Sequence, residues 1–381
     1  MSVTTSPPTT AVEPVSDERT GRPVFPISNP AAPAEAPYFE ARGFTADERY
    51  LVFRSESGGS SELYRFELAT GETVQLTQGM SVGHHSQCMA PDGRWLYFIV
   101  RDTLWRIDVP AAGKPEPVFG YTGRGPGELW PFPVSFSQDG SRVALAAKES
   151  ATGEPIPYSA TGAKQRPTHL WILDLPGGEA SKVLSWKNGF SHPMICPADP
   201  DFITFVQHGE NCWNMEAPPE GRVRTWSVRV GEGVARPFLT PLLNRTITHE
   251  SWSPDGERLF FFDKQYPKWC PVSVCSINRA GGDWQCHYTS YEYALGHGVV
   301  SPDGTRFISD CQKAGDSPLI EIDLKTGRGT VLCWPDTSQE GGHAKAAHCH
   351  PSYSPSGRWI LYTSDKSGTP RVFLTPSSQQ A

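Results

Sequence analysis

The feature of this sequence that most constrains its fold is a turn motif that recurs along the chain. Around residue 255 an apolar strand runs into the turn Ser253-Pro254-Asp255-Gly256, and a second, aromatic-rich strand leaves it. Proline fixes φ, aspartate bonds to nearby backbone and glycine accepts a positive φ, so the unit predicts a β-hairpin. The equivalent turn positions are Asp47, Asp92, Asp139, Asp199, Asp255, Asp303 and Ser356.

The spacing of these turns indicates the repeat architecture. Successive turn positions are 45, 47, 60, 56, 48 and 53 residues apart. This is the period of a four-stranded propeller blade rather than of a helical repeat. Seven copies therefore predict an all-β fold, a seven-bladed β-propeller with few helices.

Seven blades of about 50 residues account for nearly all of the 381 residues. Residues 1–36 are rich in Pro, Thr, Ala and Ser and poor in large apolar groups, which predicts a flexible tail. Residues 37–381 are predicted to form a single propeller domain. The segment 22–27 is a candidate to close the ring as an outer strand of the last blade.

Charge and composition exclude several classes of partner. The net charge is −7 and no Lys/Arg cluster occurs, which argues against nucleic-acid binding. No apolar run is long enough to cross a membrane, and the N-terminus lacks the basic start and apolar core of a secretion signal. We therefore expect no membrane partner and a cytoplasmic location. The nine scattered cysteines, with no CxxC pair, indicate unpaired thiols.

Histidines keep a constant phase with the turns. His249, His297 and His350 each lie six residues before a turn position, and His85 and His192 lie seven before. In a propeller the strand that enters this hairpin is normally the innermost one, so equal offsets place these side chains at similar height around the channel. A ring of imidazoles in a channel indicates a functional site rather than a core.

Three of the histidines are candidate metal ligands. His348 and His350 are two residues apart, so on a strand they face the same side, and His297 from the preceding blade can complete the set. Imidazole nitrogens suit Mn, Fe, Ni, Cu or Zn. The alternative is that the His-x-His spacing is incidental and each ring bonds a strand carbonyl.

Other candidates match acid–base chemistry on an anionic substrate. His249 is a candidate general base, because the pKa of imidazole lies near the working pH. Arg224 can hold a carboxylate through two parallel bonds, and its alternative is a surface arginine in a strand. His192 and His85 share the phase of the ring and are candidate substrate-binding residues.

At these residues the chain resembles the oligogalacturonate lyase family, from about Tyr38 to Leu374. The motifs that carry the resemblance are THESWSPDG at His249, GHGVVSPDG at His297, HCHPSYSPSG at His348 and His350, SHPMICPADP at His192, and VRTW at Arg224. The resemblance implies a cytoplasmic seven-bladed propeller that cleaves pectin-derived oligosaccharides by β-elimination with manganese. It further implies a base at His249, electrostatic assistance from Arg224, and metal ligands at His297, His348 and His350.

One of two departures from the family pattern concerns a metal-ligand position. Where the family has a glutamine ligand three residues before its His-x-His, this chain has Lys345. Two interpretations stay open. Either His343 or Gln339 supplies the missing ligand, or Lys345 itself neutralises the substrate carboxylate and is a substrate-binding residue.

The sequence thus predicts an enzyme: a lyase that cleaves uronate-containing oligosaccharides by metal-assisted β-elimination and leaves an unsaturated uronate. Its partner would be an anionic oligosaccharide, and Mn would be its cofactor. Two alternatives remain. The first is a lyase on a different uronate glycan with an altered or absent metal site, and the second is a noncatalytic propeller that binds protein or glycan.

Overall fold

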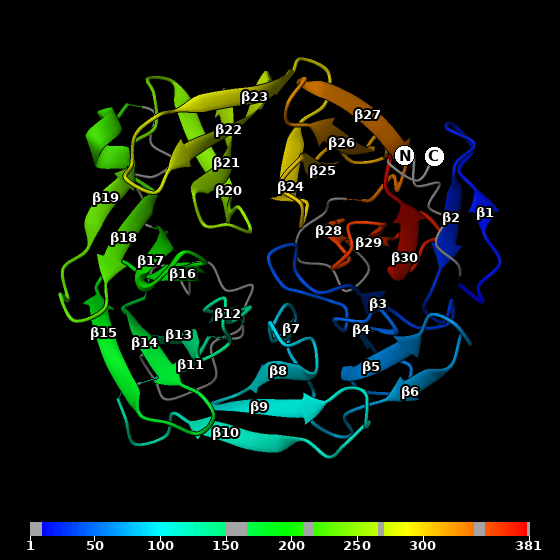
Figure 1. Cartoon of the computed structure of the whole chain (residues 1–381), viewed down its shortest axis with the longest axis horizontal. Helices are drawn as coiled ribbons and strands as arrows, with labels where there is room; N and C mark the ends of the chain where they lie inside the picture. The colour runs from blue at the N-terminus through cyan, green and yellow to red at the C-terminus, as the bar shows by residue number, and fades with distance from the viewer. Residues whose placement is uncertain are drawn as a thin grey trace, which may run out of the picture.

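The computed structural model describes residues 10–125, 127–130, 132–149, 166–208, 216–265, 270–338 and 347–378. These residues form seven antiparallel sheets arranged as blades around a central channel (Figure 1). The predicted all-β, seven-bladed propeller is confirmed. No helix in the described ranges has the length and apolar character that crossing a bilayer requires.

The strands follow one another from the channel outwards in each blade. Blade one contains β3 (Ala34–Glu35), β4 (Tyr50–Ser55), β5 (Glu62–Glu67) and β6 (Thr73–Gln75). Blade two contains β7 (Cys88–Met89), β8 (Trp95–Val100), β9 (Thr103–Asp108) and β10 (Glu116–Gly120). Blade three contains β11 (Glu128–Leu129), β12 (Ser135–Phe136), β13 (Arg142–Lys148), β14 (Thr168–Asp174) and β15 (Ala180–Trp186).

The remaining blades hold most of the candidate site residues. Blade four contains β16 (Phe190–Cys196), β17 (Asp199–Gln207), the short 3-10 helix η3 (Pro219–Arg222), β18 (Thr225–Arg229) and β19 (Arg236–Leu239). Blade five contains β20 (Arg245–Trp252), β21 (Arg258–Gln265), β22 (Val272–Asn278) and β23 (Gln285–Ser290). Blade six contains β24 (Leu295–Val300), β25 (Arg306–Cys311), β26 (Leu319–Asp323) and β27 (Arg328–Cys333). Blade seven contains β28 (Ser352–Tyr353), β29 (Trp359–Ser364), β30 (Arg371–Pro376), β2 (Pro23–Pro26) and β1 (Val15–Ser16).

The seven predicted turns each lead from an innermost strand or segment to the next strand of the blade. In the turn of blade five, Asp255 Oδ1 accepts hydrogen bonds from Ser253 Oγ at 2.6 Å and from the backbone N–H of Glu257 at 3.0 Å. Gly256 has φ +69, and a Cβ there would lie 2.3 Å from the backbone nitrogen of Ala198 in blade four. Glycine is therefore required both by the turn and by the packing of one blade on the next.

The N-terminal residues close the ring. β2 pairs with β30, placing Phe25 opposite Leu374, and the Phe25 ring packs edge-on against Trp359 at 5.2 Å between centroids. Closure by the segment 22–27 thus agrees with the sequence-based expectation. The prediction of a flexible tail over 1–36 is wrong for residues 10–36, because the chain there forms β1, β2 and β3. Val24, Phe25 and Ile27 are buried through pairing with the far end of the chain, which offsets the entropy cost of ordering the segment.

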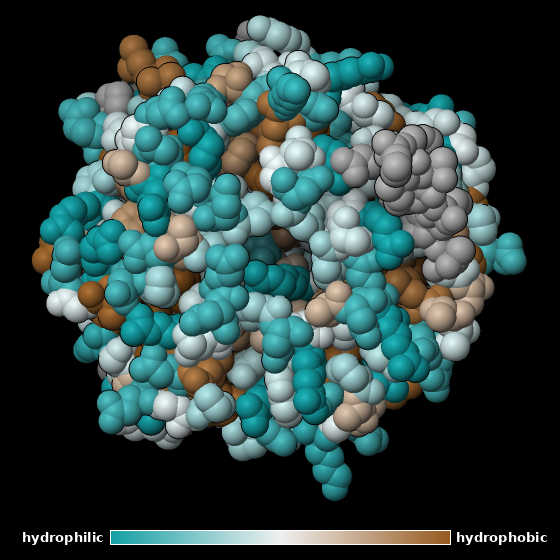
Figure 2. Space-filling view, viewed as in Figure 1, coloured by the Kyte–Doolittle hydropathy of each residue, from teal (hydrophilic) through white to brown (hydrophobic). Residues whose placement is uncertain are grey.

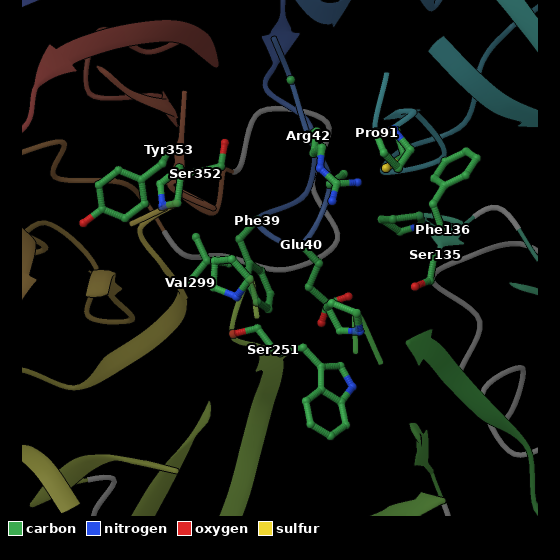
Figure 3. Close-up of a pocket in the computed structure, with 18 of the residues that line it drawn as sticks. Phe39, Glu40, Arg42, Pro91, Ser135, Phe136, Ser251, Val299, Ser352 and Tyr353 are labelled. Atoms are coloured by element: carbon green, nitrogen blue, oxygen red, sulfur yellow. The ribbon is translucent and has the colours of Figure 1, made fainter. Parts of the chain in front are cut away.

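The segment YFEARGF, residues 38–44, lies between β3 and β4 of blade one but forms no strand. Only Phe44 forms a bridge, to Leu51 of β4, and no strand includes the rest of the segment. Tyr38, Phe39 and Glu40 instead enter the channel and form what we call the channel plug (Figure 3). Its buried aromatic side chains face the channel histidines rather than a neighbouring sheet.

The packing of the plug predicts a large effect of Phe39→Ala. Phe39 is 2% exposed, and truncating a buried phenylalanine costs about 3–5 kcal/mol in free energy of unfolding. Tyr291→Ala is the matched control, since Tyr291 is 81% exposed and its truncation should cost less than about 0.5 kcal/mol. Chemical denaturation of both variants measures the difference. Equal stabilities would mean that Phe39 does not pack in the channel.

Candidate active site in the channel

Six of the candidate histidines converge on the channel, which opens as a hollow at the centre of the ring (Figure 2). Ring centroids are 4.1 Å apart for His249 and His297, and 4.2 Å apart for His297 and His350. His348 stacks on His350 at 5.5 Å, and His85 lies 4.8 Å from His350. The structure therefore brings these rings together at the height that their phase predicted.

The backbone turns these histidines towards the channel at a local cost. His85, His192, His249 and His350 have φ between +47° and +57°, the left-handed region that residues other than glycine rarely adopt. The inner strands β16, β20 and β24 each carry a register irregularity at their histidine. Such bulges redirect side chains, and strained backbone of this kind costs about 1–3 kcal/mol per residue and clusters at functional sites.

His297, His348 and His350 form a group that could hold a metal ion. One ligand nitrogen from each lies within 4.8 Å of the others. If the three nitrogens bound one ion at about 2.1 Å each, the distances between them would shorten to about 3–3.4 Å. Burial lowers the pKa of His348 to about 4 and that of His350 well below its usual value, so both rings are neutral at pH 7 and can donate lone pairs.

Asp310 on β25 holds the metal-ligand strands in place. Its Oδ2 lies 2.9 Å from His297 Nδ1, which leaves Nε2 as the nitrogen for an ion, an arrangement typical of metal-binding histidines. The backbone N–H of His297 donates to Oδ1 at 2.7 Å and that of His350 to Oδ2 at 3.2 Å. Burial alone would raise the pKa of Asp310, but the charge and hydrogen bonds of His297 lower it, so it stays a carboxylate. The residues present fit a divalent transition metal.

His249 lies beside this group without belonging to it. Burial, and then the charge of His297, lower the pKa of His249 well below its usual value. Its Nδ1 is buried and has no hydrogen-bond partner within the described ranges. A neutral imidazole has one ring nitrogen that can accept a proton.

Arg224 is a buried arginine rather than a surface one. Its Nη1 donates to Glu250 Oε2 at 2.5 Å and to the carbonyl of Ile247 at 3.3 Å. Thr225 Oγ1 donates to the other oxygen of Glu250. Glu250 is 1% exposed and anchors the guanidinium across the boundary of blades four and five.

The structure describes two of the three predicted substrate-binding residues, His192 and His85. His192 Nδ1 lies 3.3 Å from Glu40 Oε2, and its ring packs on Phe132 at 4.1 Å. Burial lowers the pKa of His85 to about 3, and its ring contacts Tyr38 at 5.0 Å. Both face the plug and the ring. Lys345, His343 and Gln339 lie outside the described residues.

The channel plug was missed by the sequence reasoning. The ring of Tyr38 lies 4.6–6.0 Å from those of His85, His192, His297 and His350, so it sits at the centre of the histidine ring. On the turn side of the plug is a cavity of about 410 Å³, lined by Phe39, Glu40, Arg42 and residues of the inner strands (Figure 3). The plug therefore separates the histidine ring from this second opening.

The described cysteines are free thiols, in agreement with the expectation from their spacing. Cys349, between His348 and His350, packs with Cys333, Ile360 and Tyr362 in the core between blades six and seven. It therefore points away from the channel, as strand alternation requires.

The chain is similar in sequence to two curated lyases. It is 25% identical over 386 residues to the oligogalacturonate lyase of Dickeya dadantii (strain 3937), which covers 94% of each chain. It is 22% identical over 383 residues to the oligogalacturonide lyase of Pectobacterium atrosepticum, again with 94% of each chain covered. No protein-family model matches the chain.

Solved structures of similar fold extend this comparison. An oligogalacturonate lyase in complex with manganese superposes with a TM-score of 0.85 at 21% identity, covering 99% of this chain and 100% of that one. The oligogalacturonate lyase of Vibrio parahaemolyticus gives 0.83 at 19% identity, with 98% and 99% covered. Because sequence and fold agree over nearly the whole chain, the resemblance to the oligogalacturonate lyase family that the histidine motifs indicated is confirmed.

Proposed function

We propose that this protein is a lyase that cleaves uronate-containing oligosaccharides, of the oligogalacturonate type, by β-elimination. The observation that carries the proposal is a division of roles in the channel. Three histidines can share one ion, whereas His249 lies outside that group, with its ring centroid 4.1 Å from that of His297. The names of the similar proteins support this choice of substrate.

The reaction begins with removal of the proton α to a uronate carboxylate, which is difficult until the developing enolate charge is offset. A divalent ion held by His297, His348 and His350 would supply Lewis-acid stabilisation of that charge, and Mn is our choice because manganese accompanies the solved oligogalacturonate lyase. Arg224, held rigidly by Glu250, orients the carboxylate from the other side.

His249 would take the C5 proton. Because its Nδ1 is buried, Nε2 is the nitrogen that can face the sugar. The low pKa keeps the ring unprotonated before substrate arrives, and an anionic substrate raises that pKa as it binds. Loss of the C4 substituent then leaves an unsaturated uronate. The cytoplasmic location stays a prediction from the sequence.

Incubation with oligogalacturonates tests the reaction type. We expect an increase in ultraviolet absorbance from the unsaturated product, and this increase should disappear after chelation and return with Mn²⁺. Binding without product would favour the noncatalytic propeller. Product formation that survives chelation would favour a lyase with an altered or absent metal site.

The double substitution His348→Ala/His350→Ala should abolish metal binding while the propeller stays folded, since it removes two of three ligands. Elemental analysis measures the metal, and circular dichroism checks the fold. His287→Ala is the matched control, because His287 lies on the outer strand β23 and bonds Ser276. A double variant that retains the metal would place the site elsewhere.

His249→Gln should lower kcat by about 10²–10⁴-fold, the usual contribution of a general base, with metal content close to that of the unsubstituted protein. Glutamine keeps polarity and bulk but offers no comparable base. Full activity would reject the assignment. Parallel loss of metal and activity would instead make His249 a ligand.

A further inference from the structure

Lys264 is a buried cation beside the histidine ring that the proposed reaction does not yet use. It lies near the end of β21, opposite Thr246 of the histidine-bearing strand β20, and is 2% exposed. Alternation along β21 puts Lys264 on the same side as Phe260 and Phe262, whose rings pack towards blade six. The ammonium lies 5.7 Å from the centroid of the Phe262 ring.

A hydrogen bond fixes the position of this ammonium at the boundary of blades five and six. Lys264 Nζ donates to Gln312 Oε1 at 2.8 Å. Gln312 in turn fills the space over Gly296, where a Cβ would lie 2.2 Å from Gln312 Cγ. Since Gly296 directly precedes His297, the lysine is coupled to the strand that carries a metal ligand and to the strand that carries His249.

Charged groups from several elements surround Lys264. Burial lowers its pKa to about 7, against the attraction of Asp310 and together with the repulsion of Arg224. Its own charge helps to lower the pKa of His249. The titratable and charged groups that act on it are Asp310 and Cys311 of β25, Cys270 before β22, Arg224 before β18, and His249 of β20.

We propose that Lys264 is a specificity-determining residue that, together with Arg224, binds the free carboxylate of a substrate uronate. This inference rests on the proposed function. Arg224 is already paired with Glu250, so that pair carries no net charge. Besides an ion at the histidine group, a second cation near Arg224 would lower the cost of burying a carboxylate there, because an uncompensated buried charge is costly.

The ammonium and the carboxylate would each lower the free-energy cost of burying the other's charge. An ammonium in this apolar surrounding is destabilised, and an incoming carboxylate would stabilise it while losing its own water. The substrate class follows from this pairing. The site should select uronates with a free acid over the same oligosaccharides with methyl-esterified carboxyls, which carry no charge.

The first arm of the test measures affinity by calorimetry, in the His249→Gln background so that substrate is not consumed. De-esterified oligogalacturonate should bind more tightly than its methyl ester. Lys264→Met should weaken binding of the acid by about 10–100-fold, the usual contribution of a charge-assisted hydrogen bond, and change binding of the ester little. Lys325→Met, at an exposed lysine between β26 and β27, is the matched control.

The second arm uses pH and needs no variant at Lys264. The ammonium is present below a pKa of about 7, so affinity for the acid should fall as pH rises through 7. Lys264→Arg keeps its charge and should restore binding with an affinity that is flat over the same range. A lysine with only a structural role would give neither a preference for the acid over the ester nor a pH-independent affinity in Lys264→Arg.

The outcomes separate this inference from the proposed reaction. Equal losses for acid and ester in Lys264→Met, unchanged affinity for both, or a pH-independent affinity in the protein with Lys264 would overturn the role of Lys264 even if lyase activity is present. Acid-selective binding that depends on Lys264, without an unsaturated product from the protein with His249, would uphold the carboxylate site and reject the lyase. Metal content, measured alongside, should stay unchanged in all Lys264 variants.

Discussion

Closure of the ring by β2 against β30 is the interaction on which the site depends. A propeller blade contacts only its neighbours, and the channel histidines come from five blades, so their convergence requires a closed circle. Blade seven is assembled from both ends of the chain, with Phe25 opposite Leu374 and packed edge-on against Trp359. His348 and His350 lie just before this blade, so pairing of the chain ends fixes two of the three candidate metal ligands against His297.

The electrostatics of the closed channel favour a cation and an anion arriving together. Arg224 forms an ion pair with Glu250, and Asp310 Oδ2 lies 2.9 Å from His297 Nδ1 in a hydrogen bond. The imidazoles of His348 and His350 are held neutral by burial. Four of the channel histidines have left-handed backbone, which is strained. Binding of a ligand by their inward-facing rings would compensate this strain.

The fold and the histidine ring could be predicted because both rest on local chemistry. A Ser-Pro-Asp-Gly turn is specified by four adjacent residues, and a histidine six residues earlier has its height on the inner strand set by the rise per residue. Asp310 and Lys264 gave no such signal, because each lies within an ordinary apolar strand and gains its role from a neighbouring blade. Within residues 10–36 the closing segment 22–27 was predicted, whereas β1, which pairs only with β2, and β3, which pairs with β4, were missed.

The channel plug separates the channel histidines from the cavity on the turn side. Tyr38 and Phe39 fill the centre of the ring, so the imidazoles face one opening while the turn-side cavity lies behind the plug. Glu40 places a carboxyl there, but burial and the nearby Glu250 raise its pKa well above the usual value. Burial thus disfavours the charged form of Glu40 beneath the site. In the proposed lyase, an anionic sugar entering from the histidine side would meet the aromatic rings of the plug, and its attraction would come from a bound ion, Arg224 and Lys264.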